Sequence, residues 1–202
     1  MSFPSRTTVL VVGAGPVGMA CALSLWLSGV KDMVLVEAAE HGNGNIASRA
    51  FAIHAATLDV SSCSILGTVF PYSIPQQALD LIGCADGLIE RGLKATTMSY
   101  YDRSFTPLIG VDFNGLIGKT QFPFCLLLPQ HLTEYVLSER LKALGVPIFR
   151  PYKVSGMREN PKDSRAVDVS FENGQSITAQ YVIGADGGQS AVRTWILVLF
   201  RC

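Results

Sequence analysis

A glycine-rich loop directly after an apolar strand is the feature that most constrains the fold of this chain. The strand, residues 7–12, is β-branched and apolar without polar alternation, which is typical of a central parallel strand buried on both faces. It leads into the loop 13–18, Gly-Ala-Gly-Pro-Val-Gly, and then into a helical stretch over 19–27. A second apolar strand, 33–36, ends at Glu37. Strand, loop, helix and strand in this order form a βαβ unit, so the sequence predicts an α/β fold with a parallel sheet.

The residue types in this loop suit a diphosphate. Gly13 permits a tight turn after the strand, Gly15 lets a pyrophosphate approach the backbone, and Gly18 lets the helix pack closely on the sheet. The helix N-terminus adds unpaired N–H groups and a partial positive charge, and Glu37 can accept hydrogen bonds from ribose hydroxyl groups. The loop therefore predicts a dinucleotide, but it does not separate NAD from FAD. The structural alternatives are a turn that only packs helix on strand and, for Glu37, a solvated charge.

Composition argues against several other functions. The 202 residues carry 16 Lys and Arg against 16 Asp and Glu, and this zero net charge argues against a nucleic-acid partner. Hydrophobic residues make up 49%, enough for a sizeable core, but no apolar run approaches the roughly 20 residues of a membrane span. The five scattered cysteines lack metal-ligand spacing, so we expect reduced thiols, no metal and, without a visible secretory signal, a cytoplasmic protein. The three histidines form no defensible triad, and we assign no catalytic residue.

The rest of the chain alternates between helix and strand signals. Gly29 marks the end of the first helix, and apolar positions at helical spacing predict a second helix from Gln130 to a stop at Gly145. Ala95–Val111 has the pattern of two strands around a turn at 102–104. The remaining expected elements are a strand over 166–171, a hairpin turn at Asn173-Gly174, a strand over 176–179 and a short apolar strand over 181–183.

Two further segments resemble a known family. Ser48-Arg49-Ala50 precedes an expected helical phrase that begins at Ile53, and Gly184-Ala185-Asp186-Gly187-Gly188-Gln189-Ser190-Ala191-Val192-Arg193 follows the last apolar strand. Together with the glycine loop, they are similar to the motifs of the class A flavoprotein aromatic hydroxylases, the group that includes phenol and p-hydroxybenzoate hydroxylases. The second segment matches that family's DG motif, G-A-D-G-x-x-S-x-V-R. The helix led by Gln130 also looks like a helix of the family.

The resemblance implies an α/β, three-layer Rossmann-like FAD-binding domain with a partial antiparallel substrate-side sheet over about residues 95–128. The cofactor-binding residues that it implies are Gly13, Ala14, Gly15, Pro16, Val17, Gly18, Glu37, Ala38, Arg49, Gln130, Val154 and Asp186. Arg49 and Gln130 would approach the FAD phosphates, and Val154 would touch adenine through its backbone. Asp186 would contact the sugar region and help position the route of NAD(P)H. Each of these residues also has a structural alternative. Arg49 would be a surface arginine that caps a helix, Gln130 an ordinary first helical residue, and Asp186 part of an Asp-Gly turn.

The resemblance also implies an activity. The intact enzyme would use NADH or NADPH and O2 to hydroxylate a phenolic or other aromatic substrate, with FAD supplying the difficult chemistry. An NAD-binding dehydrogenase is the alternative that the glycine loop alone leaves open. The sequence does not define the phenolic substrate, the preferred nicotinamide or the oligomeric state.

The chain departs from the family pattern in two places. Residues 60–77 interrupt an otherwise helical phrase, and we expect them to be either a translated, unspliced intron or a genuine loop insertion. At the end of the chain, 194–202 stands where the family continues toward its GD motif. We therefore expect 1–193 to form an incomplete FAD-binding domain followed by an aberrant tail. An inactive fragment with weak or no FAD binding is the alternative function, and exposure of the apolar stretch Trp195–Phe200 predicts poor solubility.

Overall fold

The computed structural model describes residues 2–40, 50–54 and 79–199. The chain divides into two compact units. The first comprises Met1–Asn45 and Leu137–Cys202, and the second comprises Ile46–Val136. The interruption expected over 60–77 and the position of Arg49 lie outside the described residues.

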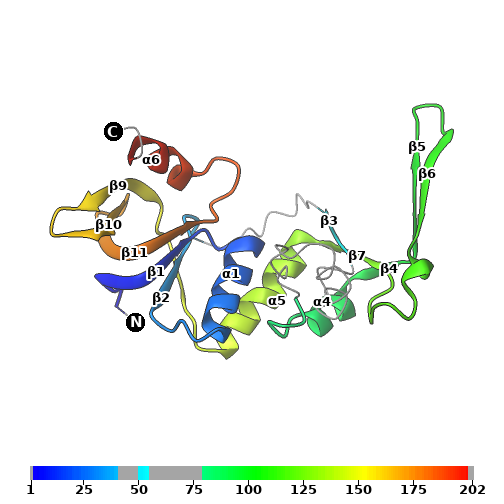
Figure 1. The fold of residues 1–202 in the computed structure, drawn as a ribbon, viewed down its shortest axis with the longest axis horizontal. Coiled ribbons are helices and arrows are strands. Elements are labelled where there is room, and N and C mark those ends of the chain that lie inside the picture. The colour runs from blue at the N-terminus through cyan, green and yellow to red at the C-terminus, as the bar shows by residue number, and fades with distance from the viewer. Residues whose placement is uncertain (1, 41–49, 55–78, 200–202) are drawn as a thin grey trace. The chain divides into compact units, whose positions relative to one another are not determined.

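The first unit is built on a six-stranded sheet of order β8-β2-β1-β11-β10-β9 (Figure 1). Its strands are β1 (Arg6–Val12), β2 (Met33–Val36), β8 (Ile148–Phe149), β9 (Val154–Asn160), β10 (Asp163–Phe171) and β11 (Ser176–Gly184). The first four strands in that order are parallel, and β10 and β9 add an antiparallel extension. Helix α1 (Pro16–Leu27) connects β1 to the neighbouring β2, so the predicted βαβ unit and the α/β fold class are confirmed.

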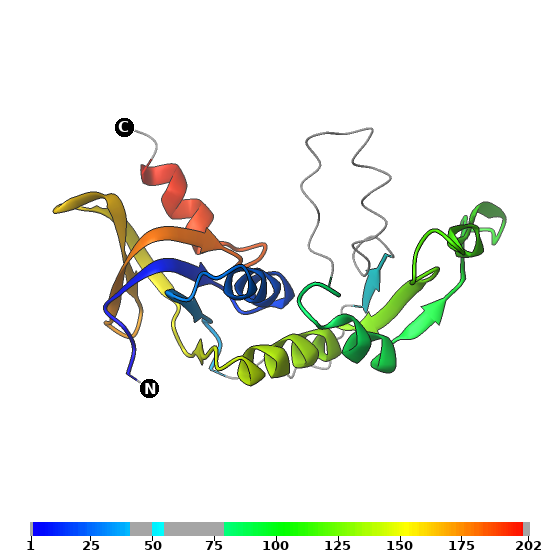
Figure 2. The same cartoon turned by 60° about the horizontal axis from the view of Figure 1, so that its bottom comes forward.

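The strand β1 is buried on both faces, as its apolar run predicts. One face, which carries Leu10, belongs to a hydrophobic cluster against which Trp195 of α6 (Ala191–Leu199) packs. Figure 2 shows α6 beside the β11 side of this sheet. Because successive side chains of a strand point to opposite faces, buried Val11 lies on the other face, where α1 contacts β1 and β2. Trp195 therefore belongs to a helix and is partly buried against this cluster. The expectation that Trp195 forms part of an exposed tail is wrong.

Turn chemistry sets several element boundaries. Gly29 (φ +96°) and Gly174 (φ +81°) adopt the left-handed conformation where the sequence predicts a helix stop and a hairpin turn. Helix α1 begins at Pro16 rather than at residue 19, because proline has a φ suited to the first helical position. The two short strands expected over 176–179 and 181–183 form one strand, β11, because β1 pairs with residues from both.

A row of polar side chains crosses the outer strands of this sheet. Asp168 of β10 lies in register with Thr178 of β11 and Arg158 of β9. Its Oδ1 accepts hydrogen bonds from Asn160 Nδ2 (2.7 Å) and Thr178 Oγ1 (2.8 Å), and Arg158 Nε lies 3.5 Å from its Oδ2. The hydrogen bonds from Asn160 and Thr178, followed by the charge of Arg158, lower the pKa of Asp168 below its ordinary value.

Because this pKa is lower in the folded than in the unfolded chain, ionised Asp168 stabilises the fold above about pH 4, and the contribution is lost as the pH falls through the folded-state pKa. We expect D168A to lower the free energy of unfolding by about 1–2 kcal/mol at neutral pH and to reduce its dependence on acid, as measured by urea denaturation at several pH values. The control is E172A, which removes an exposed ion pair with Lys153 and should change stability by less than about 0.5 kcal/mol. Unchanged acid sensitivity in D168A would contradict the prediction.

The second unit holds a three-stranded sheet and a separate two-stranded hairpin. Its elements are β3 (Ala50–Ile53), α4 (Ala85–Arg91), β4 (Leu93–Ala95), β5 (Thr97–Tyr101), β6 (Pro107–Asp112), the 3₁₀-helix η1 (Phe113–Leu116), β7 (Cys125–Pro129) and the first half of α5 (Gln130–Ala143). The sheet has the order β3-β7-β4, with both pairs antiparallel. The strands predicted around 102–104 are confirmed as β5 and β6, and the helix from Gln130 is confirmed, with Gly145 (φ +73°) after its end.

The strand β3 corrects one expectation. The resemblance implied a helical phrase that begins at Ile53, of which only Ile53 and His54 belong to the described residues. Instead, Ala50–Ile53 pairs with Leu126–Pro129 of β7, and His54 follows this strand. The apolar strand β7 offers two edges for pairing, and β3 and β4 occupy one each. Pairing with a distant strand therefore determines the conformation that the local sequence adopts.

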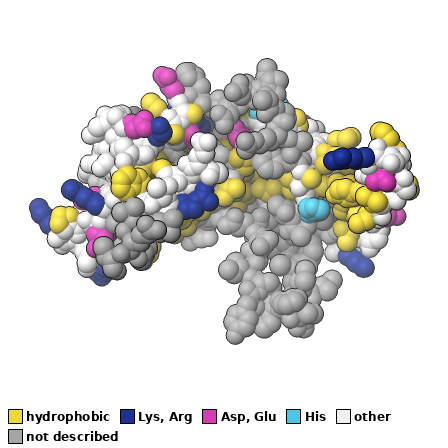
Figure 3. Space-filling view, turned by 90° about the horizontal axis from the view of Figure 1, so that it is seen from above, with side chains coloured by type: hydrophobic (Ala, Val, Ile, Leu, Met, Phe, Trp, Pro, Cys, Tyr) yellow, Lys and Arg dark blue, Asp and Glu magenta, His cyan; other side chains and the backbone are white. Residues whose placement is uncertain are grey.

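The β5–β6 hairpin has one apolar face. Its register pairs Met98 with Val111 and Tyr100 with Ile109, so these four side chains share a face, since alternate residues of a strand point the same way. Tyr100 and Ile109 remain 54% and 62% exposed. Figure 3 shows hydrophobic side chains gathered at the end of the second unit that carries this hairpin. Exposed apolar surface of this kind promotes association in solution.

We expect the double variant Y100T/I109T to remain soluble at higher concentration than the wild-type chain, because threonine keeps a preference for strands while removing apolar surface. The melting temperature should change little, since both side chains are largely exposed. Solubility is measured by the concentration at which light scattering rises. The control is Y181T, which removes an exposed tyrosine of β11 in the first unit and should give no comparable gain. Equal scattering by the double variant and the wild type would refute the prediction.

A membrane span is absent from the described part of the chain. Within residues 2–40, 50–54 and 79–199, no helix combines the length and the apolar character needed to cross a bilayer.

Candidate dinucleotide-binding site

The four parallel strands of the first unit bring distant residues to one edge of the sheet. In the order of the strands, their carboxyl ends lead into Arg150 after β8, Glu37 after β2, the loop from Gly13 after β1 and Ala185-Asp186 after β11. Ligands of open α/β sheets bind outside the carboxyl ends of the strands. The structure thus unites the glycine loop, its acidic partner and the DG motif, which the sequence presents far apart.

Two of the three loop glycines are enclosed by other backbone atoms. Gly13 has φ +101°, and a Cβ on it would lie 2.5 Å from the carbonyl oxygen of Ala185. A Cβ on Gly18 would overlap the carbonyl oxygen of Gly13. The amide of Gly13 donates to Val36 O (2.8 Å), and the amide of Ala185 donates to Val12 O (2.7 Å). The loop is therefore fixed against β2 and against the start of the DG motif.

Gly15 differs from these two glycines. No described atom lies within 4 Å of the place that its Cβ would occupy. It precedes α1, whose first residue, Pro16, has no N–H, and no described side chain caps the helix. The next residue, Val17, is largely exposed, although it is apolar. An open backbone surface at a helix N-terminus is the environment that a pyrophosphate requires.

Glu37 holds the loop from the side of β2. Its Oε2 accepts a hydrogen bond from the amide of Ala14 (2.7 Å), and its Oε1 accepts one from the amide of Ala39 (3.0 Å). The carboxylate is half-buried and is thus not simply a solvated charge at a strand end. Because a carboxylate offers about four acceptor positions, it retains capacity for ribose hydroxyl groups. The side chain of Ala38, which follows, is exposed at the same edge.

Asp186 has one satisfied and one unsatisfied carboxylate oxygen. Its Oδ2 accepts hydrogen bonds from the amides of Ala191 (2.7 Å) and Val192 (3.1 Å) at the start of α6. Its Oδ1 is buried and has no hydrogen-bond partner among the residues that the structure describes. A buried acceptor without a donor costs about 1–3 kcal/mol. This oxygen is therefore suited to a hydroxyl or amide donor from a bound group.

Two other sequence-derived residues have neighbours within their own units. Gln130 is the first residue of α5 in the second unit, and its Nε2 donates to Glu134 Oε1 (2.7 Å) within its own helix. Val154 opens β9, and its side chain is buried in the hydrophobic cluster of the first unit. Arg150 is a residue that sequence reasoning missed. The available signal was its position directly after the short apolar strand Ile148–Phe149.

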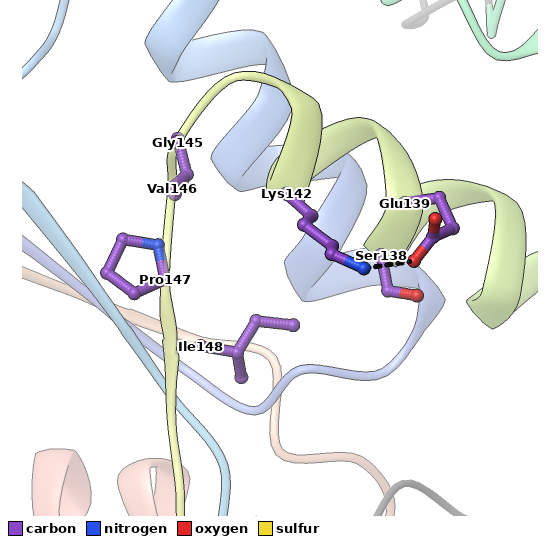
Figure 4. Close-up of a pocket in the computed structure, with 7 residues that line it drawn as sticks. All are labelled: Ser138, Glu139, Lys142, Gly145, Val146, Pro147 and Ile148. Carbon is purple, nitrogen blue, oxygen red and sulfur yellow. Dashed lines mark ion pairs between the residues drawn. The ribbon is translucent and has the colours of Figure 1, made fainter.

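A separate cavity of about 390 Å³ lies elsewhere on the first unit (Figure 4). It is lined by Ser138, Glu139, Lys142 and the segment Gly145–Ile148, and Lys142 Nζ lies 3.5 Å from Glu139 Oε1. The segment leads into β8, so this cavity lies at the amino end of that strand. Because the glycine loop follows the carboxyl end of a parallel strand, this cavity does not belong to the dinucleotide site.

The residues at the carboxyl edge fit FAD. Gly15 leaves room for a pyrophosphate, Glu37 retains acceptor capacity for a ribose, and Asp186 presents a buried oxygen without a donor. Gly13 and Gly18 contribute the fixed turn that holds these groups together.

Comparisons with known proteins lead to the same cofactor. The family model described as FAD binding domain matches residues 6–200. Rifampicin monooxygenase from Streptomyces venezuelae is 31% identical over 198 residues, which are 95% of this chain and 34% of that protein. The crystal structure of p-nitrophenol 4-monooxygenase from Pseudomonas putida matches with a TM-score of 0.74 at 28% identity, over 96% of this chain and 44% of that one. A Diels-Alderase of pyrroindomycin biosynthesis matches with a TM-score of 0.61 at 25% identity, over 95% and 34%. The chain spans about a third of the length of the curated relatives that it matches.

Proposed function

The chain belongs to the FAD binding domain family, and from this premise we propose that FAD lies across the carboxyl ends of its parallel strands. The adenosine ribose contacts Glu37, the pyrophosphate crosses Gly15 at the start of α1, and the riboflavin half extends toward Asp186. The strand order β2-β1-β11 supports this direction, because it arranges the three residues in sequence along the edge. The observation that carries the proposal is the open backbone at Gly15 between two enclosed glycines.

The proposal keeps the remaining residues derived from the sequence. Ala14, Pro16, Val17 and Ala38 belong to the two segments that border the pyrophosphate and the ribose. Arg49 and Gln130 are proposed on the phosphate side and Val154 on the adenine side, on the strength of the motifs in which they occur.

We propose further that the protein hydroxylates a phenolic or other aromatic substrate with NADH or NADPH and O2. The monooxygenases acting on rifampicin and p-nitrophenol among its relatives support this class of reaction. When bound, FAD supplies the transfer of electrons from the nicotinamide to O2. The described residues of this chain bind and orient it. Cys21, Cys84 and Cys125 are free thiols, which supports a reducing, cytoplasmic location.

The match to a Diels-Alderase favours a second candidate function. In that case the same edge would hold FAD, but the reaction would be a cycloaddition without net oxidation. The two candidates differ in their need for a reductant, since only the hydroxylase consumes NADH or NADPH.

The test is to purify the 202-residue chain with added FAD and to measure its visible spectrum and the flavin released on denaturation. We expect a stoichiometric amount of FAD, and much weaker binding of FMN, which lacks the adenosine half. NADH or NADPH is then added to the FAD-loaded protein without oxygen, and the same measurement is made on a full-length relative. Reduction of the flavin supports the hydroxylase, and its absence supports the cycloaddition enzyme. A colourless chain that does not bind FAD would refute the proposal.

A further inference from the structure

Arg150 lies at the end of the row of strand ends that forms the FAD site. The strand β8 pairs in parallel with β2, with Val36 opposite Phe149. Beyond this pair, the amide of Glu37 donates to Phe149 O (2.9 Å), and the amide of Tyr152 donates to Glu37 O (2.7 Å). These two bonds hold the segment 149–152 beside the backbone of Glu37, so the Arg150 side chain starts next to the proposed ribose ligand.

The contacts of the Arg150 side chain leave most of its guanidinium available. Its Nη1 donates to the carbonyl oxygen of Ala39 (3.2 Å), and the side chain is half-buried. Within the described parts of the chain, no carboxylate lies at ion-pair distance from it. A guanidinium has five N–H donors and a planar face that stacks on aromatic rings. One bond to a carbonyl therefore anchors the group without saturating it.

The small residues after Glu37 leave space for a planar group. Ala38 is exposed and Ala39 is half-buried, and neither side chain extends beyond a methyl group. Since the pyrophosphate direction runs from Glu37 toward Gly15, the base attached to the ribose points the other way, toward β8. In the described segment 149–152, Tyr152 also has a donor and a planar ring, but it stacks on Phe3 and donates its hydroxyl to Gln175 Oε1. The Arg150 guanidinium keeps donors and a planar face for a bound group.

We propose that Arg150 is a positioning residue for the adenine of FAD, which it contacts through its guanidinium while the bond to Ala39 fixes its orientation. This inference rests on the proposed function, because it assumes that the adenosine ribose contacts Glu37. It assigns to β8 a role in selecting the adenine dinucleotide over a flavin mononucleotide.

The test compares R150M with the wild-type chain, because methionine keeps an extended apolar side chain but removes the guanidinium. The dissociation constants for FAD and FMN are measured by flavin fluorescence. The dissociation constant for ADP is measured by its competition with FAD. We expect the constants for FAD and ADP to rise by the same factor, about tenfold, with that for FMN unchanged. R150K keeps the charge without the planar group and should bind as weakly as R150M. The control R165M removes an arginine of β10 whose side chain is 93% exposed, and all constants should stay at wild-type values.

The outcomes separate this inference from the proposed function. The melting temperature of FAD-free R150M should equal that of the wild type. A lower melting temperature, together with an equal loss of affinity for FAD and FMN, would assign Arg150 a structural role and overturn the inference. Wild-type affinity of R150M for FAD and ADP would overturn it as well, while leaving the proposed function intact. A wild-type chain that binds neither FAD nor ADP would instead refute the proposed function, and the inference with it.

Discussion

Replacing Gly18 by alanine is expected to destabilise the first unit by about 3 kcal/mol or more and to abolish FAD binding. The added Cβ would overlap the carbonyl oxygen of Gly13 and would lie 3.2 Å from Cβ of Ala185. Neither neighbour is the tip of a flexible side chain. Gly13 is held by its bond to Val36 O and Ala185 by its bond to Val12 O, so relief requires α1 to move away from the sheet. Urea denaturation followed by circular dichroism measures the loss.

The matched control for this variant is G156A in β9, where no described atom lies within 4 Å of an added Cβ. It should leave the free energy of unfolding within about 0.5 kcal/mol of the wild type. A G18A chain that unfolds at the wild-type urea concentration would show that the close approach of α1 to the glycine loop is not required.

Replacing Gly15 by alanine should have the opposite profile, with stability retained and FAD affinity reduced by roughly 10- to 100-fold. The backbone of Gly15 has φ −72° and ψ −178°, which alanine adopts without strain. No described atom opposes its Cβ, so the fold has room for the methyl group. The methyl group would instead stand where the proposed pyrophosphate meets the backbone. Fluorescence titration with FAD, together with thermal unfolding of the FAD-free chain, measures both quantities.

G156A again serves as the control and should bind FAD as the wild type does. If G15A bound FAD with unchanged affinity and unchanged stability, the pyrophosphate would not cross this glycine. If G15A instead lost stability to the same extent as G18A, the conclusion that the fold has room for a methyl group at Gly15 would be wrong.

Sequence reasoning succeeded where the information is local. The loop, its helix and Glu37 all lie within one βαβ unit, so the spacing of a few residue types predicts both the elements and their meeting point. The positive φ values at Gly29, Gly145 and Gly174 likewise follow from turn chemistry at single positions.

The rest depends on contacts between distant segments. The local sequence around Ala50–Ile53 does not predict a strand, because this segment becomes one by pairing with β7. The burial of Trp195 depends on a cluster built from several strands, and the position of Arg150 beside Glu37 depends on the pairing of β8 with β2. The sequence offers Asp186 as part of a motif, but only the fold reveals that one of its oxygens is buried without a donor.

The pairing of β1 with β11 has a consequence for synthesis on the ribosome. During synthesis α1 and β2 follow β1 directly, but the partner on its other side, β11, is the last strand in the described part of the chain. Until then one edge of an apolar strand stays open, and such an edge invites pairing with other chains. Contacts so distant in sequence also form slowly. The time between the synthesis of β1 and that of β11 is thus the period in which this domain most needs a chaperone, and slowed elongation before residue 184 would lengthen it.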